Sequence, residues 1–145
     1  MYKHIMLAVN LNHRSSWKGS LPTALSLLEH FPAQLHVIAV VQDFSNSFVS
    51  SFFPENFQGN LIKKGKQQLQ EFVQQNVPQE FQSRVQPIVG FGSVEDEIIK
   101  YVKALHIDLL IMSDYRAKHK KGMFSHPHIS AIKNHISCSM LIDRK

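Results

Sequence analysis

Cationic side chains crowd one short segment of the chain, where Arg116, Lys118, Lys120 and Lys121 fill four of the six positions from 116 to 121. Guanidinium and ammonium groups form charge-assisted hydrogen bonds with phosphate, so this segment could bind a phosphate or a nucleotide through side-chain charge. A run of charges is more often a solvated loop, because charge without fixed geometry specifies little. We favour the solvated loop and keep phosphate binding as the alternative.

Histidines flank a proline in His126-Pro127-His128, and His119 and Asp114 precede them. Imidazole suits zinc, copper or nickel, but a structural zinc site needs four well-spaced ligands. No closed ligand set is visible in this spacing. We therefore expect no physiological metal site.

The net charge of +5 allows a nucleic-acid partner, but no stacking aromatics interleave with the basic cluster and no reader motif is present. No apolar run approaches the roughly 18 to 20 residues of a membrane helix. The single cysteine, Cys138, fits a reducing compartment, and the N-terminus lacks a signal-peptide layout. We expect a cytoplasmic protein without nucleic-acid or membrane partners. Cys138 precedes an apolar strand, where a small buried side chain is the ordinary explanation rather than a nucleophile.

The elements that must position these residues alternate along the chain. Short apolar runs predict strands at 5–9, 35–41, 85–89, 109–112 and 140–142, and helical spacing predicts helices near 20–30, 60–75, 93–105 and 129–135. We expect Ser20 to cap the first helix with Pro22 in its first turn, or Pro22 to kink the helix if it starts earlier. Ser93-Val94-Glu95-Asp96 has the pattern of a capping box for the third helix.

Strands and helices in this order predict one α/β domain over residues 1–145. Its sheet should be open, doubly wound, five-stranded and mainly parallel, with helices on both faces. Ligands of such Rossmann-like sheets bind beyond the carboxyl ends of the strands, where the winding changes direction. The candidate ligand-binding residues at that edge and in the following loops are Val9, Asn10, Val40, Met112, Ser113, Tyr115, Arg116, Lys118, Lys121, His126 and His128.

Aromatic side chains are frequent between the second strand and the second helix, from Phe44 to Phe57. One interpretation is a lid whose phenylalanines pack on the domain. The other is a hydrophobic contact for a partner subunit or an apolar ligand, since large exposed aromatic patches are uncommon on monomers. The sequence leaves both interpretations open.

These features together resemble the universal stress protein family. The signals are Tyr2 to Val9 at the N-terminus, Gly92-Ser93 before an acidic helix start, Ile107 to Met112, and Ser137 to Ile142. The resemblance implies an adenine nucleotide alpha-hydrolase-like fold in a cytoplasmic protein that accumulates under stress. It also implies a homodimer joined through the last strand, here Met140 to Ile142.

The family's nucleotide-binding branch carries Gly, two residues, Gly, nine residues, then Gly-Ser or Gly-Thr, and usually an aspartate after the first strand. Aligned without a gap, the glycine positions here are Ser113, Arg116 and His126, the next is Pro127, and the aspartate position is Asn10. Glycines let backbone amides approach phosphates, and proline has no amide hydrogen to offer. We therefore expect no standard ATP binding and no cofactor, with ATP or AMP as the alternative.

The expected function is that of a non-enzymatic universal stress protein in the cytoplasmic stress response. A related adenine-hydrolase enzyme would need a Ser-Gly-Gly-x-Asp-Ser-like loop after the first strand, whereas residues 10–15 contain no glycine. Without a grip on phosphates, no group is placed to activate water on them. The alternative is a nucleotide- or phosphate-binding stress protein that uses the basic loop 116–121 in place of the glycine motif.

Overall fold

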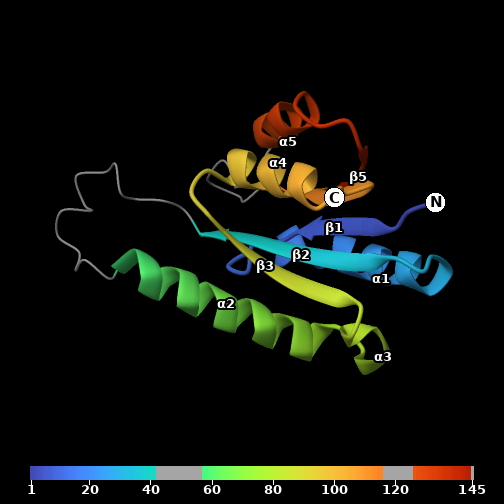
Figure 1. The fold of residues 1–145 in the computed structure, drawn as a ribbon, viewed down its shortest axis with the longest axis horizontal. Coiled ribbons are helices and arrows are strands. Elements are labelled where there is room, and N and C mark those ends of the chain that lie inside the picture. The colour runs from blue at the N-terminus through green and yellow to red at the C-terminus, as the bar shows by residue number, and fades with distance from the viewer. Residues whose placement is uncertain (42–56, 116–125, 145) are drawn as a thin grey trace.

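The computed structural model describes residues 1–41, 57–115 and 126–144, and it contains one five-stranded sheet in the order β3-β2-β1-β4-β5 (Figure 1). Every neighbouring pair of strands is parallel. The strands are β1 (His4–Ala8), β2 (Gln34–Val41), β3 (Val85–Phe91), β4 (Leu109–Asp114) and β5 (Ser139–Arg144). The described helices are η1 (Arg14–Ser16, a 3-10 helix), α1 (Ser20–His30), α2 (Phe57–Asn76), α3 (Gln79–Gln82), α4 (Val94–Ala104) and α5 (His126–Lys133). The predicted doubly wound parallel sheet is confirmed.

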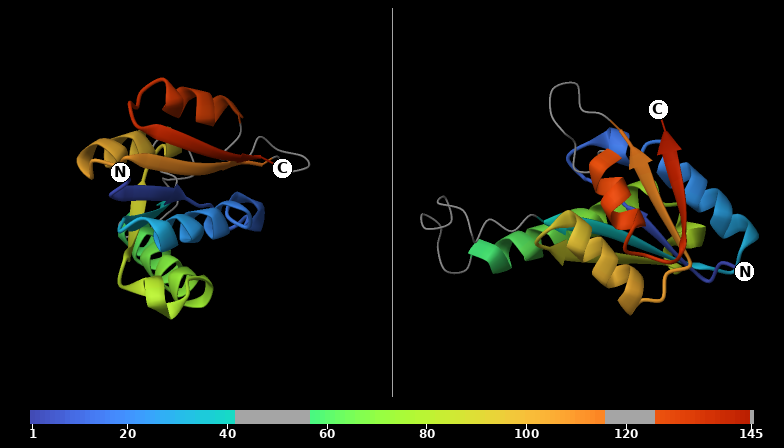
Figure 2. Two further views of the ribbon diagram at one scale, coloured as in Figure 1. Left: turned by 90° about the vertical axis from the view of Figure 1, so that its right-hand side faces the viewer. Right: turned by 90° about the horizontal axis from the view of Figure 1, so that it is seen from above.

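Helices cover both faces of the sheet, with α1 and α2 on one side and α4 and α5 on the other (Figures 1 and 2). The central strand β1 shows why its sequence is a continuous apolar run. Ile5 and Leu7 pack in the core on the α1 and α2 side, and Met6 and Ala8 pack on the α4 and α5 side. Because alternate side chains enter opposite cores, both sets must be apolar.

The two predicted helix starts turn out differently. Ser93 caps α4, where its hydroxyl accepts a hydrogen bond from the Asp96 amide at 3.5 Å. Ser20 is the first helical residue of α1 rather than its cap, and its hydroxyl donates to the Ser16 carbonyl at 3.2 Å. The preceding turn already supplies the Trp17 carbonyl, which accepts a hydrogen bond from the Leu21 amide at 2.9 Å. Pro22 lies in the first turn, where a missing amide hydrogen costs nothing.

Helix α2 lies unusually close to the sheet at Gly65. A Cβ atom built there would stand 3.1 Å from a methyl group of Val41 and 3.4 Å from one of Val89. The absence of a side chain therefore allows the helix backbone to approach β2 and β3 directly. This close approach fixes the position of the neighbouring turns of α2 above the ends of the strands.

Candidate functional site

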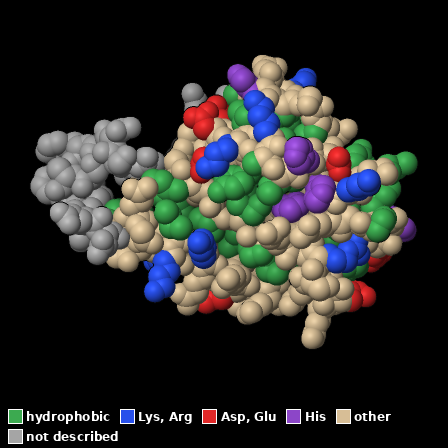
Figure 3. All heavy atoms as spheres, viewed as in Figure 1, with side chains coloured by type: hydrophobic (Ala, Val, Ile, Leu, Met, Phe, Trp, Pro, Cys, Tyr) green, Lys and Arg blue, Asp and Glu red, His purple; other side chains and the backbone are tan. Residues whose placement is uncertain are grey.

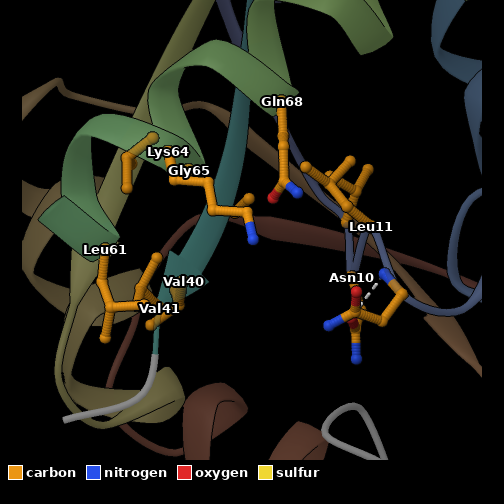
Figure 4. Close-up of a pocket in the computed structure, with 12 residues that line it drawn as sticks. Asn10, Leu11, Val40, Val41, Leu61, Lys64, Gly65 and Gln68 are labelled. Carbon is orange, nitrogen blue, oxygen red and sulfur yellow. Dashed lines mark hydrogen bonds between the residues drawn. The ribbon is translucent and has the colours of Figure 1, made fainter.

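A cavity of about 330 Å³ lies where the carboxyl ends of β1, β2 and β3 meet α2 (Figure 4). We call it the α2 cavity. Its position fits the rule that doubly wound sheets bind ligands beyond the carboxyl ends of their strands. The residues that line it are Val9, Asn10, Leu11, Asn12, Ala39, Val40, Val41, Leu61, Lys64, Gly65, Gln68 and Val89.

The walls of the α2 cavity are mainly aliphatic, and its polar groups come from two elements. From α2, Lys64 and Gln68 extend into the cavity (Figure 4). From the segment after β1, Asn10 lies across the opening from them (Figure 4), and Asn12 also lines the cavity. An apolar wall with a few convergent polar groups is the usual make-up of a small-molecule site.

Asn10 joins β1 to β4, the two strands between which the winding changes direction. Its side-chain amide donates a hydrogen bond to the Tyr115 hydroxyl at 3.3 Å, and its side-chain carbonyl accepts one from the Asn12 amide at 3.1 Å. Asn10 is 6% exposed and Tyr115 is 5% exposed. A side-chain bridge therefore spans the crevice between the ends of β1 and β4.

The loop after β1 is held by the buried hydroxyl of Ser16. This hydroxyl accepts a hydrogen bond from the Asn10 amide at 2.8 Å. It also lies within donating distance of the carbonyl oxygens of Asn10 and His13, at 2.9 and 2.7 Å. The Asn10 carbonyl also accepts from the His13 amide at 3.0 Å. These contacts satisfy the loop backbone internally, so the loop has a fixed shape.

Two buried groups, the Tyr115 hydroxyl and the Cys138 thiol, are held in their neutral forms. Burial raises the pKa of the Tyr115 hydroxyl, although the hydrogen bond from Asn10 acts in the opposite direction. Burial likewise raises the pKa of the Cys138 thiol. A protonated phenol and a protonated thiol are poor nucleophiles at neutral pH.

The turn from β3 to α4 already holds an anion of the chain itself. The Glu97 carboxylate accepts a hydrogen bond from the Phe91 amide at 2.9 Å and pairs with Lys100 at 3.2 Å. A Cβ atom at Gly90 would stand 3.0 Å from Glu97 Cβ, so a side chain there would push against α4. Gly92 has a φ of +130°, a conformation that side chains oppose.

The structure brings three of the residues predicted from sequence, Val9, Asn10 and Val40, together in the α2 cavity. Met112 is fully buried in the core that faces α4 and α5. Ser113 is 2% exposed, and its hydroxyl has no hydrogen-bond partner among the described residues.

Of the other predicted residues, Tyr115 bonds to Asn10, His128 lies on α5, and the side chains of the rest fall outside what the structure describes. His128 Nδ1 lies 2.6 Å from a carboxylate oxygen of Glu95, so it pairs with the first turn of α4. Arg116, Lys118, Lys121 and the side chain of His126 lie outside the described residues. So does the aromatic segment from Phe44 up to the start of α2 at Phe57.

The sequence analysis missed the whole α2 wall of the cavity, formed by Leu61, Lys64, Gly65 and Gln68, as well as some residues next to the predicted strand ends. One signal could have found the α2 wall. A glycine within a helical pattern costs about 1 kcal/mol relative to alanine and usually has a packing reason. Gly65 therefore marks the turn of α2 that lies closest to the sheet, and its neighbours on that turn reach the strand ends.

Three further properties can be read from residues 1–41, 57–115 and 126–144: metal-ligating groups, helix length and surface charge. No group of three or more His, Cys, Asp and Glu side chains in these ranges could hold a metal ion. No described helix has both the length and the apolar content to cross a bilayer. On the face shown in Figure 3, described Lys and Arg side chains are scattered among acidic, polar and apolar ones.

The model of the universal stress protein family matches residues 1–144. The chain belongs to the universal stress protein family. No curated protein gives a significant match. Membership agrees with the sheet order, the cavity at the strand ends and the signals quoted from the sequence.

Solved structures of the family share the fold. UspA from Lactobacillus plantarum is 17% identical, with a TM-score of 0.68 over 99% of this chain and 98% of that chain. A family protein from Arabidopsis thaliana with AMP bound is 18% identical, with a TM-score of 0.64 over 99% and 92%. A universal stress protein in complex with cAMP is 11% identical, with a TM-score of 0.59 over 99% and 97%. At these identities the likeness establishes the fold.

Proposed function

We propose that this protein is a non-enzymatic universal stress protein of the cytoplasmic stress response that does not hold ATP in the family's usual way. The observation that carries the proposal is the bridge between Asn10 and Tyr115 across the β1–β4 crevice. Asn10 stands at the family's aspartate position, and its side chain already forms a hydrogen bond within the protein. The replaced glycine positions, Ser113, Arg116 and His126, support the same conclusion, because bulky residues keep backbone amides away from phosphates.

The absence of catalysis is part of the proposal. Tyr115, at the carboxyl end of β4, and Cys138, at the opposite edge of the sheet before β5, both have pKa values raised by burial. The Glu97 carboxylate is engaged with the Phe91 amide and Lys100. None of these groups is poised to activate water on a phosphate.

Nucleotide binding is the second candidate function, because the neighbouring structures contain AMP and cAMP. The α2 cavity supports it, since it opens at the ends of β1 and β2. In this case the phosphates would need another set of donors, such as Arg116, Lys118, Lys120 and Lys121. AMP, with fewer phosphates to hold than ATP, would be the more favourable nucleotide.

Thermal melting with and without excess ATP, AMP and pyrophosphate separates the two functions. A ligand at a hundredfold excess over its dissociation constant stabilises the native state by about 2.7 kcal/mol, which raises Tm by several degrees. We expect no shift with any of the three. A shift with AMP or ATP that disappears in the double variant Arg116→Ala, Lys121→Ala would establish the second function instead.

A homodimer through β5 is also part of the proposal. β5 is the last strand of the sheet, and its central residues Met140, Leu141 and Ile142 are only half-buried. An apolar edge strand with unpaired backbone groups readily pairs with another strand. Light scattering at high protein concentration should give the mass of two chains. A further partner contact through Phe44 to Phe57 remains a hypothesis.

A further inference from the structure

The α2 cavity has one charged side chain among its described lining residues, that of Lys64. Figure 4 shows Lys64 extending from α2 into the cavity, with the Gln68 amide one turn further along the helix. The two ion pairs of the described ranges, Lys100 with Glu97 and His128 with Glu95, do not involve Lys64. The described lining therefore presents an ammonium group without a neighbouring carboxylate.

The rest of the lining favours an apolar ligand body. The ends of β1, β2 and β3 contribute aliphatic side chains, and α2 adds Leu61. Transfer of apolar ligand surface from water into such a lining is favourable in proportion to the area buried. The cavity volume of about 330 Å³ is near the lower end of the range for small-molecule sites. A matching ligand is small and apolar, with one polar end.

The single positive charge of the described lining indicates which polar group the ligand carries. One ammonium balances one negative charge, as in a carboxylate. A phosphate monoester carries a charge of about −1.5 to −2 at pH 7 and is best bound by several cations or a forked guanidinium. The side-chain amides of Gln68 and Asn12 are hydrogen-bond donors, and a carboxylate can accept hydrogen bonds from them.

We propose that the α2 cavity binds a small monocarboxylate with an apolar body and that Lys64 holds its carboxylate. The ligand chemistry assigned here differs from that of a nucleotide, and it uses donors on α2 rather than the segment after β4. The proposal goes beyond the proposed function, a non-enzymatic stress protein that does not hold ATP in the usual way, because that function names no ligand. Either can fail while the other stands.

The single tryptophan of the chain, Trp17, provides a reporter of occupancy. It lines a second cavity of about 440 Å³ that shares Leu11, Asn12 and Gln68 with the α2 cavity. Its ring contacts Phe72 of α2 with 4.9 Å between centroids. A ligand that displaces the shared residues changes the surroundings of the indole and therefore its emission.

The test uses three probes with one body and different heads: 3-phenylpropionate, 3-phenylpropan-1-ol and 3-phenylpropylamine. Binding is measured by Trp17 emission and by isothermal titration at pH 7 and low salt. We expect the carboxylate to bind at least tenfold more tightly than the alcohol, and the amine not to bind. Lys64→Met should reduce the carboxylate to the affinity of the alcohol and leave the alcohol unchanged.

Lys63→Met is the matched control, since Lys63 is exposed like its neighbour Lys64 but does not line the cavity. It should retain the full preference for the carboxylate. The proposal is overturned if no probe binds the wild-type protein, if the three bind equally, or if the preference persists in Lys64→Met. Melting with ATP in the same variants keeps the two proposals apart, because an ATP shift that survives Lys64→Met contradicts only the proposed function.

Discussion

The side-chain amide of Asn10 donates a hydrogen bond to the hydroxyl of Tyr115 at 3.3 Å, and this contact links the loop after β1 to the end of β4. Both side chains are buried. The link lies at the position where the strand order reverses, which is where doubly wound proteins place their ligands. In this chain the crevice between the two strands is occupied by the protein's own polar contact.

Removing the Tyr115 hydroxyl should destabilise the protein measurably. Tyr115→Phe leaves the buried Asn10 amide with one partner fewer, at a cost of about 1 to 2 kcal/mol. For a chain of this length, Tm should fall by a few degrees, as measured by circular dichroism. Tyr101→Phe on α4 is the control and should stay within about 0.5 kcal/mol of wild type. A Tyr115→Phe protein that melts like the wild type would mean that the bridge contributes little.

Restoring the family's aspartate should not restore ATP binding. In Asn10→Asp the Tyr115 hydroxyl can reverse its role and donate to the new carboxylate, so the variant should fold. The glycine positions Ser113 and Arg116 remain filled, and phosphates still lack access to backbone amides. We expect no shift of Tm with ATP. Stabilisation of the variant by ATP, absent in the wild type, would show that the aspartate position alone controls binding.

The sequence predicted the fold because local patterns and the global arrangement agree. The continuous apolar run at β1 identified a strand covered on both faces, and Ser93 identified the start of α4 through its cap. The predicted cap at Ser20 was wrong, because serine is found both at helix caps and in first turns, and the residue type alone does not distinguish the two positions. Only the preceding turn, whose Trp17 carbonyl accepts from the Leu21 amide at 2.9 Å, distinguishes them.

The candidate site was predictable only from its strand side. Val9, Asn10 and Val40 follow from the rule that carboxyl ends of parallel strands share one edge. Lys64 and Gln68 do not, because the register of a helix over a sheet is set by tertiary packing. Gly65 was the one local sign of that register, and its meaning depends on Val41 and Val89, which are distant in sequence.

Glycines at two positions of α2 should respond differently to substitution. Alanine is favoured over glycine in helices by about 1 kcal/mol, so Gly59→Ala, which meets nothing within 4 Å, should raise Tm. Gly65→Ala gains the same helix preference but meets Val41 at 3.1 Å, so it should raise Tm less or not at all. Gly65→Val should lower stability by about 1 to 3 kcal/mol through overpacking. Equal gains at both positions in urea unfolding would argue against close packing at Gly65.

Acid sensitivity should arise from a histidine pair on β1 and β2. His36 is 2% exposed, its Nε2 lies 3.2 Å from His4 Nδ1, and its own Nδ1 has no partner among the described residues. Burial, and secondarily the charge of His4, lowers the pKa of His36 below 6.5. As the pH falls below about 6.5 the unfolded chain therefore takes up a proton that the folded protein excludes, and stability decreases until the folded-state pKa is reached.

Urea unfolding from pH 8 to pH 5 tests this origin. His36→Leu should flatten the loss of stability between pH 6.5 and 5, whereas His30→Gln, at an exposed position at the end of α1, should retain it. Asp108 does not account for this window. Hydrogen bonds from the backbone amides of His4 and Lys3 lower its pKa from 3.8, so it titrates at more acidic pH. An unchanged slope in His36→Leu would assign the acid loss to other groups.

Proline at two successive positions of β5, whose amides face opposite edges of the strand, should separate dimerisation from folding. The Ser139 amide donates to the Asp108 carbonyl, toward β4, so by alternation the Leu141 amide also faces β4 and the Ile142 amide faces the open edge. Ile142→Pro removes a donor from the edge alone and should give a folded monomer by light scattering and circular dichroism. Leu141→Pro removes a ladder hydrogen bond and should destabilise the domain by about 3 kcal/mol or more. A dimer that persists in folded Ile142→Pro would place the subunit contact elsewhere, because pairing of β5 with its copy requires the outward amides of this strand.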